Sequence, residues 1–236
     1  SPVFVIGGAG LYEALLERDL RPVQTASANP VAVVSGYHPD LRWRTVVDGA
    51  ILVKGGLPWF ATNTDMTVPT VEGNGPGNGV LVDAVARYSG AEPVVAGKPR
   101  PPLFEETRRR VGGERPLVVG DRLDTDIEGA VNAGLDSLLV MTGVTGLEEL
   151  VVAGTGKRPT YISSDLAGLG TAHPAPVTTE DGCRLDGWEA TVRDGALVVE
   201  GGGTSDSWWR VVATASWHHL DTTGVPVDVA GLRAPR

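Results

Sequence analysis

The chain has 236 residues, of which 42% are hydrophobic and 21% are charged, and its formal net charge at pH 7 is −9. This composition is typical of a folded protein with one or several domains. A nucleic-acid backbone is excluded as the main partner, because phosphate binding needs clustered Lys and Arg. No apolar run is long enough to span a bilayer, so we expect no membrane partner. A single cysteine, Cys183, excludes an internal disulfide and favours a cytoplasmic location.

Residues 1–93 alternate β-branched apolar runs with helical periodicity, which predicts an α/β fold with a largely parallel sheet. The expected strands are 3–6, 31–34 and 59–61, and the expected helices are 11–16, 43–53 and 79–88. A second unit continues this alternation over residues 94–172. Its expected strands are 117–119 and 137–140, and its expected helices are one around 103–104 and one over 127–133. Apart from Ser137, both strands are apolar at every position, which predicts that they lie inside a sheet.

The pattern changes in the last part of the chain. Residues 188–193 and 196–199 predict a β-hairpin joined by an Asp194-Gly195 turn. The helix expected next has apolar residues at helical spacing, namely Trp208, Val211, Val212 and Ala215. We interpret residues 177–236 as a small appended βα module.

The strongest chemical signal is an apolar strand that ends in Gly120-Asp121 and leads into a helix. Open α/β sheets bind ligands at the carboxyl ends of their strands. Asp121 can offer a hard oxygen to Mg²⁺, and Gly120 lets the backbone turn closely beside it. Asp126 lies one helical turn further on and can orient the site without binding the ion. The alternative for Asp124 and Thr125 is that they cap the helix.

A second signal is Gly97-Lys98-Pro99, which also follows an apolar stretch. A lysine at this place could neutralise a phosphoryl oxygen during a transfer step. Taken alone, Lys98 is better explained as a solvated residue before a helix that begins with proline. Its position about one βα unit before Gly120-Asp121 makes the pair more specific.

These residues resemble the haloacid-dehalogenase (HAD) superfamily, in the branch with a large α/β cap that includes phosphoglycolate, pyridoxal phosphate and glycerol 3-phosphate phosphatases. Gly97-Lys98-Pro99 is similar to the third signature loop of that family, and residues 120–126 are similar to the fourth. Residues 60–65 and 76–79 resemble cap stretches. The match covers residues 3–165. The C-terminal part is most similar to actinobacterial glycerol 3-phosphate phosphatases with an extra module.

The resemblance implies an α/β cap domain over 1–93, the C-terminal part of a Rossmann-like HAD core over 94–172, and the appended module over 177–236. It implies Mg²⁺-dependent hydrolysis of a small phosphorylated metabolite through an aspartyl-phosphate. Lys98, Asp121 and Asp126 would be catalytic, with Asp121 as the metal ligand. The substrate would lie against Lys98 and a loop rich in Gly and Pro over 63–79, whose candidate binding residues are Asn63, Asp65, Gly77 and Gly79.

Two signature loops of the family have no counterpart in this sequence: the Asp-x-Asp-Gly loop with the nucleophile, and a Ser or Thr loop that binds the phosphoryl group. The nearest candidate, residues 46–49, lacks a second Asp and lies in a helical pattern. The resemblance therefore implies an absent N-terminal segment and an inactive chain. The strand at 117–119 would lie at an open edge, which another copy in a homo-oligomer or a retained peptide would cover.

Two other functions remain open at this point. Gly8-Ala9-Gly10 follows a strand, as in dinucleotide-binding dehydrogenases, but the third glycine of that fingerprint is missing. A catalytically silent binding or assembly module is the other alternative, because no nucleophile loop is present. His218-His219 suggests a metal only weakly, since neighbours on a helix point to different sides. The tryptophans, among them Trp188 and Trp217, are expected to pack the module.

Overall fold

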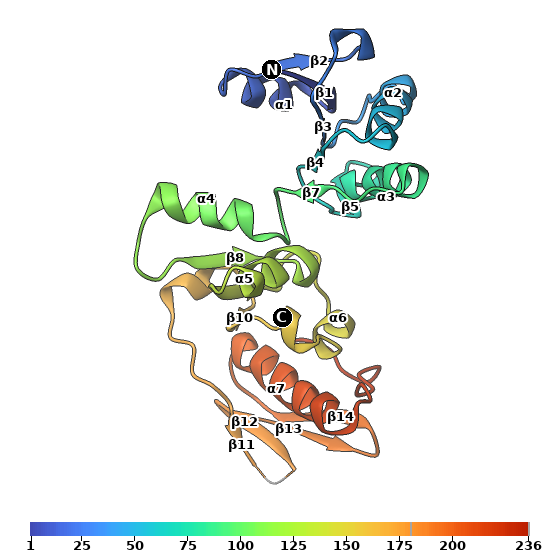
Figure 1. Ribbon diagram of the computed structural model, residues 1–236. Coiled ribbons are helices and arrows are strands. Elements are labelled where there is room, and N and C mark those ends of the chain that lie inside the picture. Colours follow the sequence, from blue (N-terminus) through green and yellow to red (C-terminus); the bar gives the residue numbers. More distant parts are fainter. Residues whose placement is uncertain (180, 236) are drawn as a thin grey trace. The chain divides into compact units, whose positions relative to one another are not determined.

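The computed structural model describes residues 1–179 and 181–235 and divides into two compact units, Ser1–Glu106 and Thr107–Arg236 (Figure 1). Each unit has its own sheets and its own hydrophobic core. Across the described residues, we find no helix that is long and apolar enough to cross a membrane. The α/β class expected from the sequence is confirmed. The finer division into 1–93, 94–172 and 177–236 stays a prediction.

The first unit is built on a five-stranded parallel sheet with the order β2-β1-β3-β4-β7. A separate two-stranded antiparallel hairpin, β5-β6, is the other sheet described in this unit. The elements are β1 (Pro2–Ile6), α1 (Ala9–Leu16), β2 (Arg21–Val23), η1 (Ala26–Ala28), β3 (Ala32–Ser35), α2 (Trp43–Lys54), β4 (Trp59–Ala61), β5 (Thr67–Thr70), β6 (Gly73–Pro76), α3 (Asn78–Ser89), β7 (Val94–Val95) and α4 (Pro101–Val111). All three expected strands and all three expected helices of this part are present.

The core of the first unit lies between its sheet and the helix pair α2 and α3. Phe4 and Ile6 of β1 are fully buried, and Gly49 lets α2 approach both side chains closely. Each large apolar side chain buried in this way contributes roughly 1.5–3 kcal/mol relative to exposure. Ser35 is also fully buried, but its Oγ accepts a hydrogen bond of 3.1 Å from Nε1 of Trp59, so it is satisfied.

The sequence prediction was incomplete over 63–79, which was expected to be a loop. Thr67–Thr70 and Gly73–Pro76 pair there as the hairpin β5-β6. The signal was weak because β6 consists of Gly, Asn, Gly and Pro, which are depleted in strands. The short strand β2 was missed for a related reason, because it has three residues and contains a proline.

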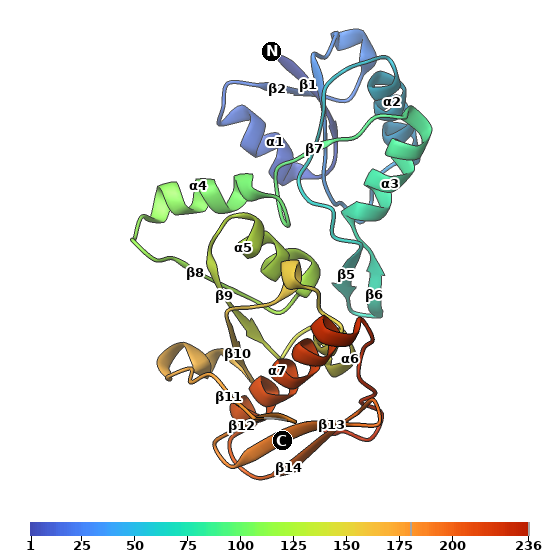
Figure 2. The same cartoon turned by 60° about the horizontal axis from the view of Figure 1, so that its bottom comes forward.

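The second unit combines a parallel sheet, β10-β9-β8, with an antiparallel sheet, β11-β12-β13-β14. Figure 2 shows the long helix α7 lying along the antiparallel sheet. The elements are β8 (Leu117–Gly120), η2 (Leu123–Ile127), α5 (Glu128–Asn132), β9 (Asp136–Val140), α6 (Leu147–Val151), η3 (Thr155–Lys157), β10 (Tyr161–Ser163), η4 (Leu166–Gly170), β11 (Val177–Thr178), β12 (Gly182–Leu185), β13 (Trp188–Arg193), β14 (Ala196–Gly201) and α7 (Ser205–Thr223).

One hydrophobic core joins both sheets of the second unit. It includes Ile127 and Leu139 beside the parallel sheet together with Trp208 and Trp209 of α7. The two tryptophan rings meet edge to face with their centroids 4.8 Å apart, so they pack the module as expected. The predicted Asp194-Gly195 turn is confirmed, with φ of 51° and 79°, values that suit a two-residue hairpin.

The two strands expected inside a sheet differ in their surroundings. β9 lies between β8 and β10, and Leu138 and Leu139 are fully buried. β8 is instead an edge strand that pairs only with β9 among the described residues, and Leu117 is 39% exposed. The placement of β8 inside a sheet is thus not observed. A strand with this apolar sequence commonly has neighbours on both sides.

Candidate functional site

Asp121 follows the carboxyl end of β8 and is held by the loop that follows β9. The amide of Val144 donates a 2.8 Å hydrogen bond to its Oδ2, and the amide of Thr145 donates one of 3.0 Å to its carbonyl oxygen. The described residues provide no hydrogen bond or ion pair to Oδ1. Asp121 is half-buried, so one carboxylate oxygen is fixed and the other is left for a ligand.

Gly143 determines how closely these two loops approach each other. A Cβ atom at position 143 would overlap with the carboxylate of Asp121, including Oδ2. A glycine is therefore required if the amide of Val144 is to reach that oxygen. The sequence analysis missed Gly143. Its position could have indicated this role, because Met141-Thr142-Gly143 follows the end of β9 just as Asp121 follows the end of the neighbouring β8.

Asp126 supports the same turn from the helix side. The amide of Arg122 donates a 3.2 Å hydrogen bond to Oδ2 of Asp126, whose carboxylate packs directly against Gly120. Asp126 is only 8% exposed. Gly120 thus allows the side chain of Asp126 to approach the backbone closely. From the sequence, this glycine had been expected to serve the turn beside Asp121. Asp126 fixes the backbone on both sides of Asp121, as a positioning residue would.

The helix expected over 127–133 begins earlier, with the π-helical turn η2. Capping by Asp124 is not observed, because the residue that precedes η2 is Arg122 and no side chain caps it. Asp124 instead accepts two hydrogen bonds from the Arg122 guanidinium, of 2.9 and 2.6 Å. Thr125 lies inside the turn. It is 3% exposed, and its hydroxyl has no hydrogen-bond partner among the residues that the structure describes.

Lys98 belongs to the first unit, in the loop after β7. This loop runs directly beside the loop after β4, because a Cβ atom at Gly97 would overlap with the carbonyl oxygen of Thr62. The next residue along the β4 loop is Asn63. The structure therefore brings Lys98 and Asn63 onto neighbouring loops at the carboxyl edge of the parallel sheet.

The other four predicted substrate-binding residues of the first unit also lie together. They are Asn63, Asp65, Gly77 and Gly79. The amide of Asp65 donates to Oδ1 of Asn63 at 3.2 Å, and the amide of Gly79 donates to the carbonyl oxygen of Asp65 at 2.9 Å. Gly77 lines a cavity of about 460 Å³, whose wall includes Tyr37, His38, Trp43, Thr70 and Asn78. These contacts fix the loop after β4 against the first turn of α3.

Asn78 is a further residue that the sequence analysis passed over, although it lies between two candidates. It is 2% exposed, and its Nδ2 donates a 2.7 Å hydrogen bond to the carbonyl oxygen of Asn63. Its Oδ1 is buried without a partner in the described part of the chain. The signal was the Gly77-Asn78-Gly79 sequence itself, because an amide between two glycines at a helix start can bind the backbone of a neighbouring loop.

Metal ligands are sparse in both units. Over residues 1–179 and 181–235, no group of three His, Cys, Asp or Glu side chains is arranged to hold a metal ion. His218 and His219 lie on α7 with exposed or half-buried side chains. Lys98 lies in the first unit and Asp121 in the second.

Comparisons with known proteins place this arrangement in a family. Residues 95–169 match the family model described as HAD-hydrolase-like. The chain is 39% identical over 224 residues to D-glycerol 3-phosphate phosphatase of Mycobacterium tuberculosis. The matched region covers 91% of this chain and 62% of that protein. It is 35% identical over 152 residues to 5'-nucleotidase YutF of Bacillus subtilis, covering 64% of this chain and 58% of that protein.

Solved structures give the same result. Glycerol phosphate phosphatase from Mycobacterium tuberculosis in complex with magnesium matches with a TM-score of 0.80 and 39% identity over 92% of this chain and 66% of that one. Its complex with calcium matches with a TM-score of 0.79 and 37% identity, over 99% of this chain and 68% of that one. The chain spans 62% and 58% of the two sequence relatives. From the motif loops, the family model and these matches together, the chain belongs to the HAD-like hydrolases.

Proposed function

We propose that the protein containing this chain is a magnesium-dependent phosphatase that hydrolyses a small phosphate monoester through an aspartyl-phosphate. The observation that carries this proposal is the carboxylate of Asp121 at the end of β8. One of its oxygens is fixed by the amide of Val144, and the described residues leave the other without a partner. A half-buried, oriented carboxylate at the end of a parallel strand is suited to a hard cation.

The residues present fit one side of a magnesium site. Asp121 would supply one hard oxygen, and on either side of it lie the buried hydroxyls of Thr125 and Thr145, which have no hydrogen-bond partner among the described residues. Bound magnesium would supply positive charge to the phosphoryl oxygens. Asp121 would supply an oxygen to the ion, and Asp126 keeps the Arg122 amide, and with it the turn, in place. The remaining protein ligands would come from outside residues 1–236.

Lys98 would hold the phosphoryl group by a charge contact. The reaction needs a carboxylate that attacks phosphorus while the ester oxygen leaves and gains a proton, followed by water that releases phosphate from the aspartyl-phosphate. We propose that this nucleophile lies in a segment outside residues 1–236. Lys98, on a loop fixed against Thr62, would meet the developing negative charge without having to rearrange.

The first unit would select the leaving group. Two sequence relatives are named after different substrates, glycerol 3-phosphate and 5'-nucleotides. Glycerol 3-phosphate is the substrate we propose, because the chain is more similar to the former relative and matches it over a longer range. Asn63, Asp65, Gly77 and Gly79 would form the binding surface for the alcohol part.

A catalytically silent binding module is the second candidate. It is favoured by the open edge of β8 and because, among the described residues, Asp121 alone offers an oriented carboxylate oxygen without a partner at the candidate metal site. Both features agree equally well with a phosphatase that is completed by a further segment.

One experiment separates the two candidates. The intact gene product that contains residues 1–236 is purified, its mass is measured, and phosphate release is followed with glycerol 3-phosphate, a 5'-nucleotide and an aryl phosphate, with and without Mg²⁺. Magnesium-dependent release supports the phosphatase, and faster release from glycerol 3-phosphate supports the substrate. An intact product without turnover on any of the three would establish the silent module instead.

A further inference from the structure

A cavity of about 240 Å³ lies in the second unit, apart from the loops around Asp121. It is bounded by β10, α7 and the strap, which we define as residues 171–176. Its walls are mainly apolar or aromatic and include Tyr161, Pro174, Pro176 and Trp217. Pockets for drug-sized ligands have volumes of roughly 300–1,000 Å³, so this one suits a smaller molecule.

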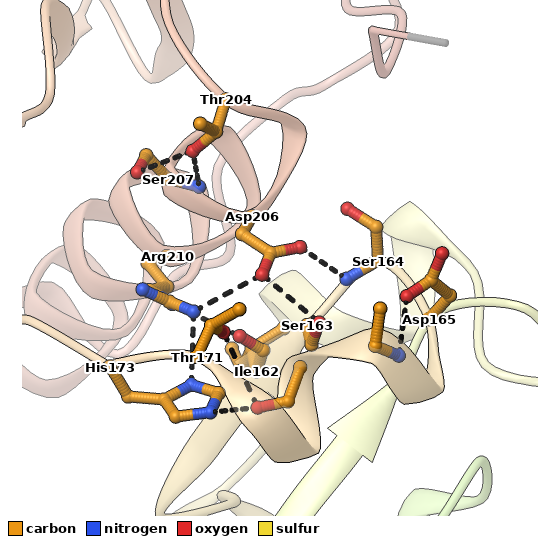
Figure 3. A network of polar contacts seen from close by, with 12 residues as sticks. Ile162, Ser163, Ser164, Asp165, Thr171, His173, Thr204, Asp206, Ser207 and Arg210 are labelled. Atoms are coloured by element: carbon orange, nitrogen blue, oxygen red, sulfur yellow. Dashed lines mark hydrogen bonds and ion pairs between the residues drawn. The ribbon is translucent and has the colours of Figure 1, made fainter.

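Arg210 is the charged residue of this cavity, and it is 8% exposed. Its Nε donates a 3.0 Å hydrogen bond to the carbonyl oxygen of Ile162, and its Nη2 lies 2.9 Å from Nδ1 of His173 and 3.4 Å from Oδ2 of Asp206 (Figure 3). The described residues provide no partner for Nη1. A guanidinium has five N–H donors, so both donors of Nη1 remain for another acceptor.

Asp206 is the counterion of Arg210, but its shorter hydrogen bonds go to other groups. That carboxylate accepts hydrogen bonds from the amide of Ser164 at 2.7 Å and from the hydroxyl of Ser163 at 3.0 Å, and it lies in the first turn of α7 (Figure 3). Burial acts to raise the pKa of Asp206, but these hydrogen bonds and the charge of Arg210 lower it below its ordinary value. The Arg210 contact, at 3.4 Å, is longer than a strong charge-assisted hydrogen bond.

His173 contributes no second charge in this arrangement. Its Nε2 lies 2.8 Å from the carbonyl oxygen of Gly168, which can only accept, so Nε2 carries the proton. Its Nδ1 faces Nη2 of Arg210 and therefore accepts. The ring packs against Tyr161 with centroids 5.0 Å apart and forms part of the wall.

We propose that this cavity binds a small monocarboxylate with a flat apolar body. The carboxylate would accept from Nη1 of Arg210, and the body would lie against the aromatic and proline side chains of the strap, β10 and α7. A single buried cation with a partly engaged counterion favours one negative charge over a doubly charged phosphate. The apolar walls favour a body without further polar groups, because an unpaired polar group there is costly.

The test uses the complete chain and two probes of similar shape, benzoate and benzyl alcohol, in isothermal titration calorimetry. Benzoate should bind with one site per chain, and benzyl alcohol should bind at least about tenfold more weakly, because hydrogen bonds to a charged group are among the stronger ones. Equal affinities for the two probes, or no binding of benzoate, would overturn the proposal.

Variants at the exposed face of the strap test the location without disturbing the core. Ala175 lines the cavity and Ala172 does not, and both are exposed. Ala175→Glu places a negative charge at the cavity, which repels the negative charge of benzoate and should weaken its binding by about tenfold or more. Ala172→Glu should leave the affinity within about twofold of the wild-type value. Circular dichroism checks that both variants fold. If both substitutions change the affinity equally, benzoate binds elsewhere and the assignment is wrong.

Discussion

The loops that carry the candidate residues are built in different ways in the two units. In the first unit, the loops after β4 and β7 are held by backbone contacts and by uncharged side-chain amides, because Gly97 packs on the Thr62 carbonyl and Nδ2 of Asn78 donates to the Asn63 carbonyl. In the second unit, the loop after β8 is held by side-chain carboxylates, since Asp121 and Asp126 each accept from a backbone amide. The loops of the first unit therefore depend on close steric fit and uncharged hydrogen bonds, whereas the loop after β8 depends on charge as well.

This difference separates two kinds of substitution. A larger side chain at a close-packed glycine is expected to push loops apart in either unit. Removal of charge alone, with the shape kept, is expected to disturb the loop after β8 in particular, because its carboxylates both fix the loop and would serve the reaction. The predictions below test this distinction in a version of the protein that turns over phosphate esters.

The largest effect is expected for Asp121→Asn and Lys98→Ala in the proposed phosphatase. Each removes a preorganised charge contact, which typically costs on the order of 10²- to 10³-fold in kcat. The measurement is phosphate release at saturating Mg²⁺ and substrate. Asp124→Asn is the matched control, because Asp124 lies on the same loop but pairs with Arg122. A similar loss in the control variant, or near wild-type turnover in both test variants, would disprove the site assignment.

A somewhat smaller effect is expected for Gly143→Ala, which leaves every charge in place. The new methyl group would overlap with the Asp121 carboxylate and move it, and a displacement of about 1 Å can cost on the order of 10²-fold in rate. The apparent affinity for Mg²⁺ should fall together with kcat. Gly146→Ala is the control in the same loop, because its Cβ would meet only Oε2 of Glu148, at 3.7 Å. Full activity in Gly143→Ala would show that Asp121 is not positioned by this contact.

The sequence predicted the regular elements well where apolar periodicity was strong. The run Val3-Phe4-Val5-Ile6 and the helix from Trp43 both follow from spacing alone, and the structure shows both. The hairpin β5-β6 was missed because its second strand is made of turn-forming residues. Helix capping was an alternative for Asp124 because its residue type favours that place, but a neighbouring guanidinium binds it instead.

The candidate site was predictable only as far as its motifs are continuous in sequence. Gly120-Asp121 and Gly97-Lys98-Pro99 could be found because each is a strand end followed by a helix. Gly143 and Asn78 could not be given a role, because each acts on a loop 15 or more positions away in the chain. Such contacts depend on which strands are neighbours, and this information enters only with the sheet order.

A smaller effect, on specificity, is expected for Asn63→Ala. This change removes the hydrogen bond from the Asp65 amide to Oδ1 of Asn63 and loosens the loop after β4 without altering Lys98. We expect a roughly three- to tenfold change in kcat/KM for glycerol 3-phosphate relative to phosphoglycolate, and little change for an aryl phosphate. Equal losses on all three substrates would instead show that the first unit holds the loops and does not select the leaving group.

The smallest effect is expected for Asp206→Asn, on the stability of the second unit in acid. This variant tests whether the second unit depends on carboxylates beyond the loop around Asp121. Hydrogen bonds from Ser164 and Ser163 and the charge of Arg210 outweigh the effect of burial and hold the pKa of Asp206 below its ordinary value. A lowered pKa in the folded state stabilises the protein above the ordinary value of about 3.9, and this stabilisation is lost as the pH falls through the folded value. The urea midpoint of the wild type should therefore fall more steeply below about pH 4 than that of Asp206→Asn, which has no charge to lose.

The control for this measurement is Asp194→Asn, at an exposed turn position where φ is 51° and Asn is well tolerated. It should follow the wild-type profile, because the structure describes no side-chain contact of Asp194 that a charge would strengthen. If the urea midpoint of Asp206→Asn shows the same pH dependence as that of the wild type, the contacts around Arg210 depend on packing rather than on the charge of Asp206. The dependence on carboxylates would then be confined to the loop around Asp121, and the contrast between the two units would apply to that loop alone.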